Sequence, residues 1–248
     1  MSVWSFNTEA KISYSNFSVF IFSHLVIILV SMASYAEDQP IYIENMSNSS
    51  KVAILGNQIS NNVKSGQILT PGDRVQTTDS SARIAFADGS LLTLGKNSEL
   101  EIKKTELDSQ SKQNVKTVFL KAGFIHARIH HQEGEPSPHF YIETKTAVVG
   151  VRGTEFTMHS AENDDLKIHV LEGKVGIASD RSKFESAQLI STGQMVNAKA
   201  KLISPPESFN LAEYRKKLSL EYPEVHKVIY NKIKSQTESV KPKRRHRK

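Results

Sequence analysis

The sequence predicts an all-β domain with a short C-terminal α-helical extension, and three observations carry this prediction. From Val52 to about Ile203, short apolar runs alternate with breaks rich in Gly, Asp, Asn or Pro, which is the pattern of strands and turns. Apolar residues in these runs recur with period two, and no helical stripe is found among them. After Ser204 the apolar spacing becomes helical. We therefore expect a β-solenoid-like or twisted β-sandwich domain over residues 52–203.

The chain has an ordinary globular composition, with 38% hydrophobic and 23% charged residues, so it can bury a core. It contains no cysteine. Disulfides, cysteine nucleophiles, thiolate metal sites and a lipidated cysteine are thereby excluded. The absence of thiols also suits an oxidising compartment.

Residues 17–32, FSVFIFSHLVIILVSM, form the long apolar run of the sequence. The run is shorter than the roughly 20 residues of a spanning helix, and small Ser34 and Ala36 follow it, so we expect a secretory signal over residues 1–36, cleaved near Ala36. The alternative is an uncleaved inner-membrane anchor that uses residues 17–36. Both place the rest of the chain in the periplasm or another extracytoplasmic space, beginning with an N-terminal linker over residues 37–51.

Alternating apolar residues and turn motifs predict the strands of the β-domain. In SARIAFADGS, residues Ala82, Ile84 and Phe86 share one face, which is typical of a half-buried strand. Asp88-Gly89 then forms a tight turn, because glycine tolerates positive φ and aspartate caps its own backbone.

Two weak internal repeats also occur. VFLKAGFIHAR aligns with IHVLEGKVGIA, which places Gly123 on Gly173, and LTPGDRV aligns with ISTGQMV, which places Gly72 on Gly193. Each unit is a strand, a glycine-bearing turn and a strand. Stacking of such units favours a β-solenoid or a twisted sandwich.

The C-terminal region is expected to be a helical extension over residues 204–236, followed by a disordered basic tail over residues 237–248. Leu211, Tyr214 and Leu218 follow helical spacing, and a second such series runs over 225–233. Prolines before each series suit helix starts.

The ordered motifs of the β-domain resemble those of the FecR-like domain family. GQILTPGDRVQTTDSSARIAFADGSLLTLGKNSELEI resembles the opening half, with a Gly-Asp before one strand and an Asp-Gly-Ser after the next. IETKTAVVGVRGTEFTM, followed by LKIHVLEGKVGIAS, resembles the closing half with its Arg-Gly-Thr-x-Phe signature, and the likeness extends over about 52–196. The motif residues, all expected to be structural, are Gly72, Asp73, Asp88, Gly89, Ser90, Arg152, Gly153, Thr154, Phe156 and Gly173.

The resemblance implies an extracytoplasmic, non-enzymatic, all-β module. In the founding members of the family this module senses an outer-membrane receptor and passes the signal through one helix to a cytoplasmic sigma-factor regulator. Only about sixteen residues precede the apolar run here, so we do not expect that cytoplasmic domain. The chain instead resembles FecR-like modules that stand alone.

Arg152 is flanked by Gly150 and Gly153, and two roles are open to it. An anion-binding or catalytic arginine would need partners, but no nucleophile or base motif lies nearby. We expect a structural role in which the guanidinium binds backbone carbonyls at a strand crossing and the glycines permit close backbone approach. No catalytic motif appears elsewhere, so we expect no enzyme activity and no cofactor.

Four histidines, His126, His130, His131 and His139, lie close together in the sequence. Positions four apart in an extended strand stand about 13 Å from each other, too far to share an ion. A loop that brings His130 to His139 is the alternative. We expect solvated histidines and no metal site.

The basic tail carries the net charge of the chain. Its bases are Lys241, Lys243, Arg244, Arg245, Arg247 and Lys248. Without them the sequence holds 26 basic and 26 acidic groups. The tail is either a solvated extension or a tether to an anionic membrane or cell-wall surface; nucleic acid is not an expected partner of an exported chain without interleaved aromatic residues.

The function we expect is protein interaction or signal sensing in the bacterial cell envelope, with another envelope protein as partner. The alternative is a structural component that binds cell-wall glycan or an anionic surface through the β-domain and the tail. Glycan binding favours exposed aromatic residues, and the single tryptophan, Trp4, lies in the expected signal. The oligomeric state is left open by the sequence.

Overall fold

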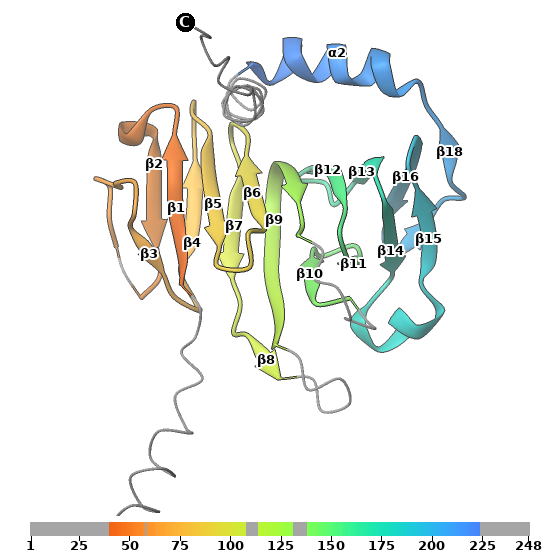
Figure 1. The fold of residues 1–248 in the computed structure, drawn as a ribbon, viewed down its shortest axis with the longest axis horizontal. Coiled ribbons are helices and arrows are strands. Elements are labelled where there is room, and N and C mark those ends of the chain that lie inside the picture. The colour runs from red at the N-terminus through yellow and green to blue at the C-terminus, as the bar shows by residue number, and fades with distance from the viewer. Residues whose placement is uncertain (1–39, 58, 108–113, 131–137, 224–248) are drawn as a thin grey trace, which may run out of the picture. The chain divides into compact units, whose positions relative to one another are not determined.

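The computed structural model describes residues 40–57, 59–107, 114–130 and 138–223 (Figure 1). Within these ranges the chain forms two β-sheets that share one hydrophobic core, followed by one α-helix. We call the two sheets A and B.

Sheet A contains, in spatial order, β3 (Ile68–Leu69), β1 (Ile41–Met46), β5 (Ala82–Phe86), β6 (Leu91–Leu94), the second half of β9 (Asn114–Arg128), β12 (Glu155–Ser160), β13 (Leu166–Glu172) and β16 (Gln194–Lys199), with β17 (Leu202–Ile203) and β18 (Glu207–Ser208) beside β16. Sheet B contains β2 (Val52–Leu55), β4 (Arg74–Thr77), β7 (Glu99–Ile102), the first half of β9, β10 (Phe140–Glu143), β11 (Val148–Val151), β14 (Lys174–Ala178) and β15 (Gln188–Ser191). The short β8 (Glu106–Leu107) pairs with the start of β9.

Strand β9 joins the two sheets. Its first half pairs with β7 and β10 in sheet B, and its second half pairs with β6 and β12 in sheet A. Gly123 marks the change, with a φ of 101° that only glycine adopts readily. A Cβ placed there would lie 2.3 Å from Ser98 Oγ and 2.4 Å from Ser98 Cα. A side chain at this position would therefore force the two backbones apart.

The glycines that the internal repeats align all lie where the chain passes between the sheets. Gly72 precedes β4, Gly123 lies within β9, Gly173 separates β13 from β14, and Gly193 separates β15 from β16; all four have positive φ. The aligned units cross in opposite directions, however. The aligned units therefore share a glycine at the passage between the sheets. The strand before the glycine lies in sheet A in one unit and in sheet B in the other.

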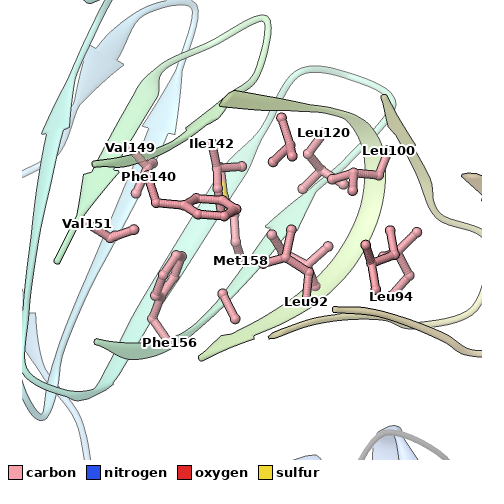
Figure 2. Packing of buried hydrophobic residues seen from close by; sticks show 14 of the residues in the cluster. Leu92, Leu94, Leu100, Leu120, Phe140, Ile142, Val149, Val151, Phe156 and Met158 are labelled. Atoms are coloured by element: carbon pink, nitrogen blue, oxygen red, sulfur yellow. The ribbon is translucent and has the colours of Figure 1, made fainter. Parts of the chain in front are cut away.

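The core lies between the sheets and is continuous through both (Figure 2). Phe140 and Ile142 of sheet B lie opposite Phe156 and Met158 of sheet A, and all four side chains are fully buried. Phe140 also meets Phe86 edge to face, with ring centroids 4.9 Å apart. Burial of each large side chain contributes about 1.5–3 kcal/mol, so the shared core is the main force that holds the sheets together.

Helix α2 (Leu211–Glu221) follows β18 after Phe209 and Asn210. The Asn210 side chain accepts a hydrogen bond from the backbone N–H of Glu213 at 3.1 Å, which satisfies one of the donors left open at a helix start. In Figure 1, α2 runs from the side of β16 towards β9.

The all-β class with a short C-terminal helix is confirmed by the structure. Apart from the parallel β9–β10 pair, the described strand pairs are antiparallel, which is the pairing of a twisted sandwich. One expectation needs correction: the linker proposed over residues 37–51 contains β1, which lies between β3 and β5 in sheet A. Alternation in IYIENM was too short to mark it as a strand.

The helical extension proposed over residues 204–236 contains α2 and also the short strand β18. The second helix and the basic tail lie outside the described residues, as does the secretory signal. Among the residues that are described, no helix is long and apolar enough to cross a membrane.

Candidate functional site

A row of polar side chains runs across the outer face of sheet A. Strand register places five residues side by side on β5, β6, β9, β12 and β13. Their sequence neighbours point into the core, so these side chains point outwards. We call them the polar row: Arg83, Thr93, His126, Thr157 and His169.

The polar row is buried although it faces away from the core. Its members are between 1% and 9% exposed. An outward sheet face usually carries solvated polar groups, and buried polar groups are costly unless they are paired. The groups that pair with this row therefore define the site.

The chain after sheet A covers one end of the polar row. We call residues Phe209–Tyr222, which include α2, the strap. The ring of Tyr214 stacks on His169, with centroids 4.0 Å apart and planes at 15°. Its hydroxyl is hydrogen-bonded to Thr157 Oγ1 at 2.8 Å. Phe209 completes the contact by packing edge to face with the His169 ring, with ring centroids 5.1 Å apart.

A second aromatic contact holds the far end of the strap. Tyr222 stacks on Phe124 of β9 with ring centroids 3.9 Å apart. Gly95 makes room for this stack, since a Cβ there would lie 3.1 Å from Phe124 and 3.3 Å from Tyr222. The strap thus rests on sheet A at two points, one on β12 and β13 and one on β9.

An ion pair lies beside the polar row. His126 Nε2 is 2.8 Å from Glu155 Oε1, and Arg128 lies 3.5 Å from the other carboxylate oxygen. Burial raises the pKa of Glu155, but the hydrogen bond of His126 and the charges of His126, Arg128 and Arg215 together outweigh burial. The pKa of Glu155 therefore falls to about 2. The carboxylate is therefore a fixed negative charge beside the polar row.

The two rings that stack in the strap contact are both neutral at neutral pH. Burial lowers the pKa of His169 to about 4, and the charges of Lys167 and Lys217 act in the same direction. Burial raises the pKa of Tyr214 to about 12 against the opposing effect of its bond to Thr157. The contact is thus one between an uncharged imidazole and a phenol.

The motif residues Gly72 and Asp73 form a turn between the sheets. The side chain of Asp73 is fully buried and accepts hydrogen bonds at 2.8 Å from both the N–H and the hydroxyl of Thr70. The N–H of Gly72 donates to the carbonyl of Ile102 on β7. This pair fixes the entry of the chain into β4.

The Asp88-Gly89-Ser90 motif gathers three segments of the chain. Asp88 accepts from the N–H and hydroxyl of Ser90 at 2.9 and 3.0 Å, and from Lys116 of β9 at 2.9 Å. Ser90 in turn accepts from the N–H of His130. Burial opposes ionisation of Asp88, but Lys116 and Ser90 together lower its pKa.

The Arg152-Gly153-Thr154 motif forms the crossing from β11 to β12. Gly153 has a φ of 60°, and the Thr154 carbonyl accepts from the N–H of Ile129 at 2.9 Å. A Cβ at Gly173 would lie 2.8 Å from the Gly153 carbonyl oxygen, so the two crossings pack closely. Phe156, the last motif residue, lies in the core.

At Gly150 we expected the close approach of a neighbouring backbone, but a side chain approaches instead. The group that approaches is the ring of Phe184, 2.2 Å from where a Cβ would lie, and not a neighbouring backbone. Gly176 admits the same ring, which also meets Tyr141 edge to face at 5.0 Å. The two glycines thus form a slot on the outer face of sheet B.

The expectation of solvated histidines is wrong for His126 and His139, which are each 4% exposed. His126 binds Glu155, and His139 Nε2 lies 3.8 Å from Asp88. His130 is exposed and lies near the same turn as His139. Within the described part of the chain, no three potential ligands lie close enough to hold a metal ion.

Sequence reasoning missed the His126–Glu155 pair and the strap contact. The alternation of β9 and β12 does place both pair members outwards, but their pairing depends on a register between strands 29 residues apart. Tyr214 was recognised as part of a helical stripe. Nothing local in the sequence identifies His169 as its partner.

Residues 73–176 match the family model described as FecR protein. The match runs from the start of β4 into β14 and is narrower at both ends than the resemblance seen in the sequence. No curated protein matches the chain.

Two solved structures, both of a candidate anti-sigma factor from Parabacteroides distasonis, are similar to the chain. The first has 17% identity and a TM-score of 0.46 over 61% of this chain and 65% of that one. The second has 17% identity and a TM-score of 0.42 over 56% and 59% of the two chains. The chain therefore covers less than two thirds of the length of either.

Proposed function

We propose, from the premise that residues 73–176 of this chain are a FecR domain, that the protein is a non-enzymatic module that binds another protein of the bacterial cell envelope in signal sensing. The observation that carries this proposal is the outer face of sheet A, where the polar row and the Glu155 carboxylate are held in fixed positions. Fixed polar and aromatic groups on a rigid sheet suit recognition of a protein surface. The proposed location is extracytoplasmic, after cleavage near Ala36.

Hydrogen bonding also supports a role in binding. Acid–base catalysis needs a base within hydrogen-bonding reach of the reacting group. Here Asp73 and Asp88 each accept hydrogen bonds within a turn, and Glu155 is hydrogen-bonded to His126. Each of these carboxylates thus has a structural partner, which favours a binding role over a catalytic one.

A second candidate function rests on the basic tail. Six bases among the last eight residues would attract an anionic surface, with about 1 kcal/mol for each charge near such a membrane. On this proposal the protein is a structural envelope component tethered to cell-wall glycan or lipid. The attraction would be salt-sensitive.

Site-specific photo-cross-linking in cells tests the two candidates. We would place the photoreactive residue at Glu172, exposed on the outer side of sheet A, and at Lys121, exposed on sheet B, as the matched control. Each would be made in the full chain and in a chain with the six tail bases replaced by glutamine. We expect a discrete protein adduct from position 172 that persists without the tail charges.

Two results would contradict the protein-binding proposal. Equal labelling from both positions would remove the special role of sheet A. Adducts with bulk polymer alone, lost when the tail is neutralised, would instead favour the tethered structural component. Mass spectrometry of the same material gives the N-terminus, which we expect at Glu37.

A further inference from the structure

The strap is held to sheet A by the ends of a few side chains. None of the described side chains of α2 is fully buried, and Leu220 is 74% exposed. The contacts that hold it include the two ring stacks of Tyr214 and Tyr222, the edge-to-face contact of Phe209, the hydrogen bond of the Tyr214 hydroxyl and the hydrogen bond from the Phe209 N–H to the Gly193 carbonyl. A helix of 11 residues is marginal in water by itself, so its helical state depends on these contacts.

The surface beneath the strap can also face water. A helix that permanently covers a sheet normally buries an apolar stripe. Here Tyr214 covers the hydroxyl of Thr157 and the imidazole of His169, with the ionised Glu155 nearby. Such groups are readily hydrated when uncovered. The face is therefore compatible with both a covered and an open state.

The side chains of the covered face determine which groups of a ligand can bind there. A flat neutral imidazole takes an aromatic ring, and the adjacent threonine takes a phenolic hydroxyl. In α2 both groups are supplied by Tyr214. A helix that presents a tyrosine matches both features.

We propose that the outer face of sheet A from β9 to β13 is a docking surface for a helix of a partner protein that presents a tyrosine, and that α2 is its built-in competitor. This inference rests on the proposed function, because it assigns the partner's binding mode. The short connection from Ser204 to Asn210 gives α2 an effective concentration of the order of millimolar. A partner helix must therefore bind the face tightly enough to displace α2 at this effective concentration.

A labelled peptide with the sequence of residues 205–223, PPESFNLAEYRKKLSLEYP, serves as the probe. Fluorescence anisotropy measures its binding to the full chain, to a Tyr214→Ala/Tyr222→Ala variant whose own strap is released, and to a Leu220→Ala control. We expect the released variant to bind the peptide at least about 10-fold more tightly than either of the others. The same peptide with its own Tyr214→Ala change should not bind.

Equal peptide binding to all three chains, or to none, would overturn the proposal. If the double variant does not fold, the isotopically labelled wild-type chain gives the same test. Excess peptide should then speed hydrogen exchange at the amides of α2, and an unchanged rate would overturn the proposal. A negative result in these peptide experiments does not remove the adduct expected from position 172. A partner could bind sheet A without displacing the strap, so the two proposals can fail separately.

Discussion

Glu155 lies within the Arg-Gly-Thr-x-Phe motif and stabilises the fold through a residue outside that motif. Its backbone continues the crossing into β12, and its side chain binds His126 of β9. Alternation predicts that Glu155 faces away from the core. Its partner could not be predicted, because a residue's neighbour across a sheet is set by register and not by sequence distance.

Glu155→Gln removes the negative charge that faces His126 Nε2 and Arg128 and puts a neutral amide in its place. We expect a loss of about 1–3 kcal/mol in the free energy of unfolding at pH 7, the cost of breaking a charged hydrogen bond. The pKa of Glu155 falls from 4.5 to about 2 on folding, so its stabilising effect is present above pH 4.5 and fades as the pH falls towards 2. Urea unfolding of the wild-type and Glu155→Gln proteins between pH 7 and pH 2 measures this difference in the free energy of unfolding.

The matched control is Glu172→Gln, on the strand next to Glu155 but exposed. It should change stability by less than about 0.5 kcal/mol. An effect of Glu155→Gln that matches the control, or that stays constant down to pH 2, would mean that the ion pair contributes little.

His169 makes the strap sensitive to pH. Its pKa is lowered from 6.5 to about 4, so protonation disfavours the folded contact, and stability is lost as the pH falls from about 6.5 towards 4. The groups that face it are the rings of Phe209 and Tyr214 and the charges of Lys167 and Lys217. We expect hydrogen exchange of α2 amides, corrected for intrinsic rates, to quicken over this range.

His169→Phe keeps an aromatic ring beneath Tyr214 and removes the titrating group. The pH dependence of α2 exchange should then largely disappear. His159 on β12 also has a pKa lowered by burial and by Lys167, so it is the second candidate for any dependence that remains. If the variant keeps the full pH response, His169 is not its source.

At the scale of elements, turn chemistry was the most informative part of the sequence. The glycine breaks predicted where strands end, and the aligned pairs Gly72–Gly193 and Gly123–Gly173 all proved to be points where the chain changes sheets. Which strands then pair could not be read from them. The strand β9 shows why: KAG looks like a turn in sequence, yet the chain continues through it as one strand of 15 residues.

Gly123→Ala tests the crossing in β9. Positive φ alone costs a non-glycine residue about 1–2 kcal/mol, and the new Cβ would also meet the Ser98 backbone at 2.4 Å. We expect a total loss of more than about 3 kcal/mol, or failure to fold. The control is Gly193→Ala, which has a φ of 77° but no atom within 4 Å of the new Cβ, so it should cost only the conformational term.

Urea denaturation of the two variants measures this difference. Equal losses would show that conformation alone sets the cost at both crossings. A larger loss at Gly193 would contradict the close packing of Gly123 against Ser98.

At the scale of the whole molecule, the sequence predicted the all-β class and the helix that follows it, because both depend on local periodicity. It left open the choice between a solenoid and a sandwich, which depends on long-range pairing. Val118 and Leu120 of sheet B and Ile125 and Ala127 of sheet A belong to one strand and to one core. Such sharing between sheets is a property of the assembled fold that no local pattern specifies.

This shared strand predicts how residues 40–203 unfold. Because β9 supplies both sheets and the core is continuous, neither half of the sandwich can lose its strands without exposing the other. We expect far-UV circular dichroism and tyrosine fluorescence to report one coincident urea transition. Native-state hydrogen exchange should give amides of β5 and β13 the same opening free energy, with α2 opening well below it. Different opening energies for β5 and β13 would mean that the sandwich is two units joined by β9, and an α2 that opens only with the sheets would make the strap a permanent part of the fold.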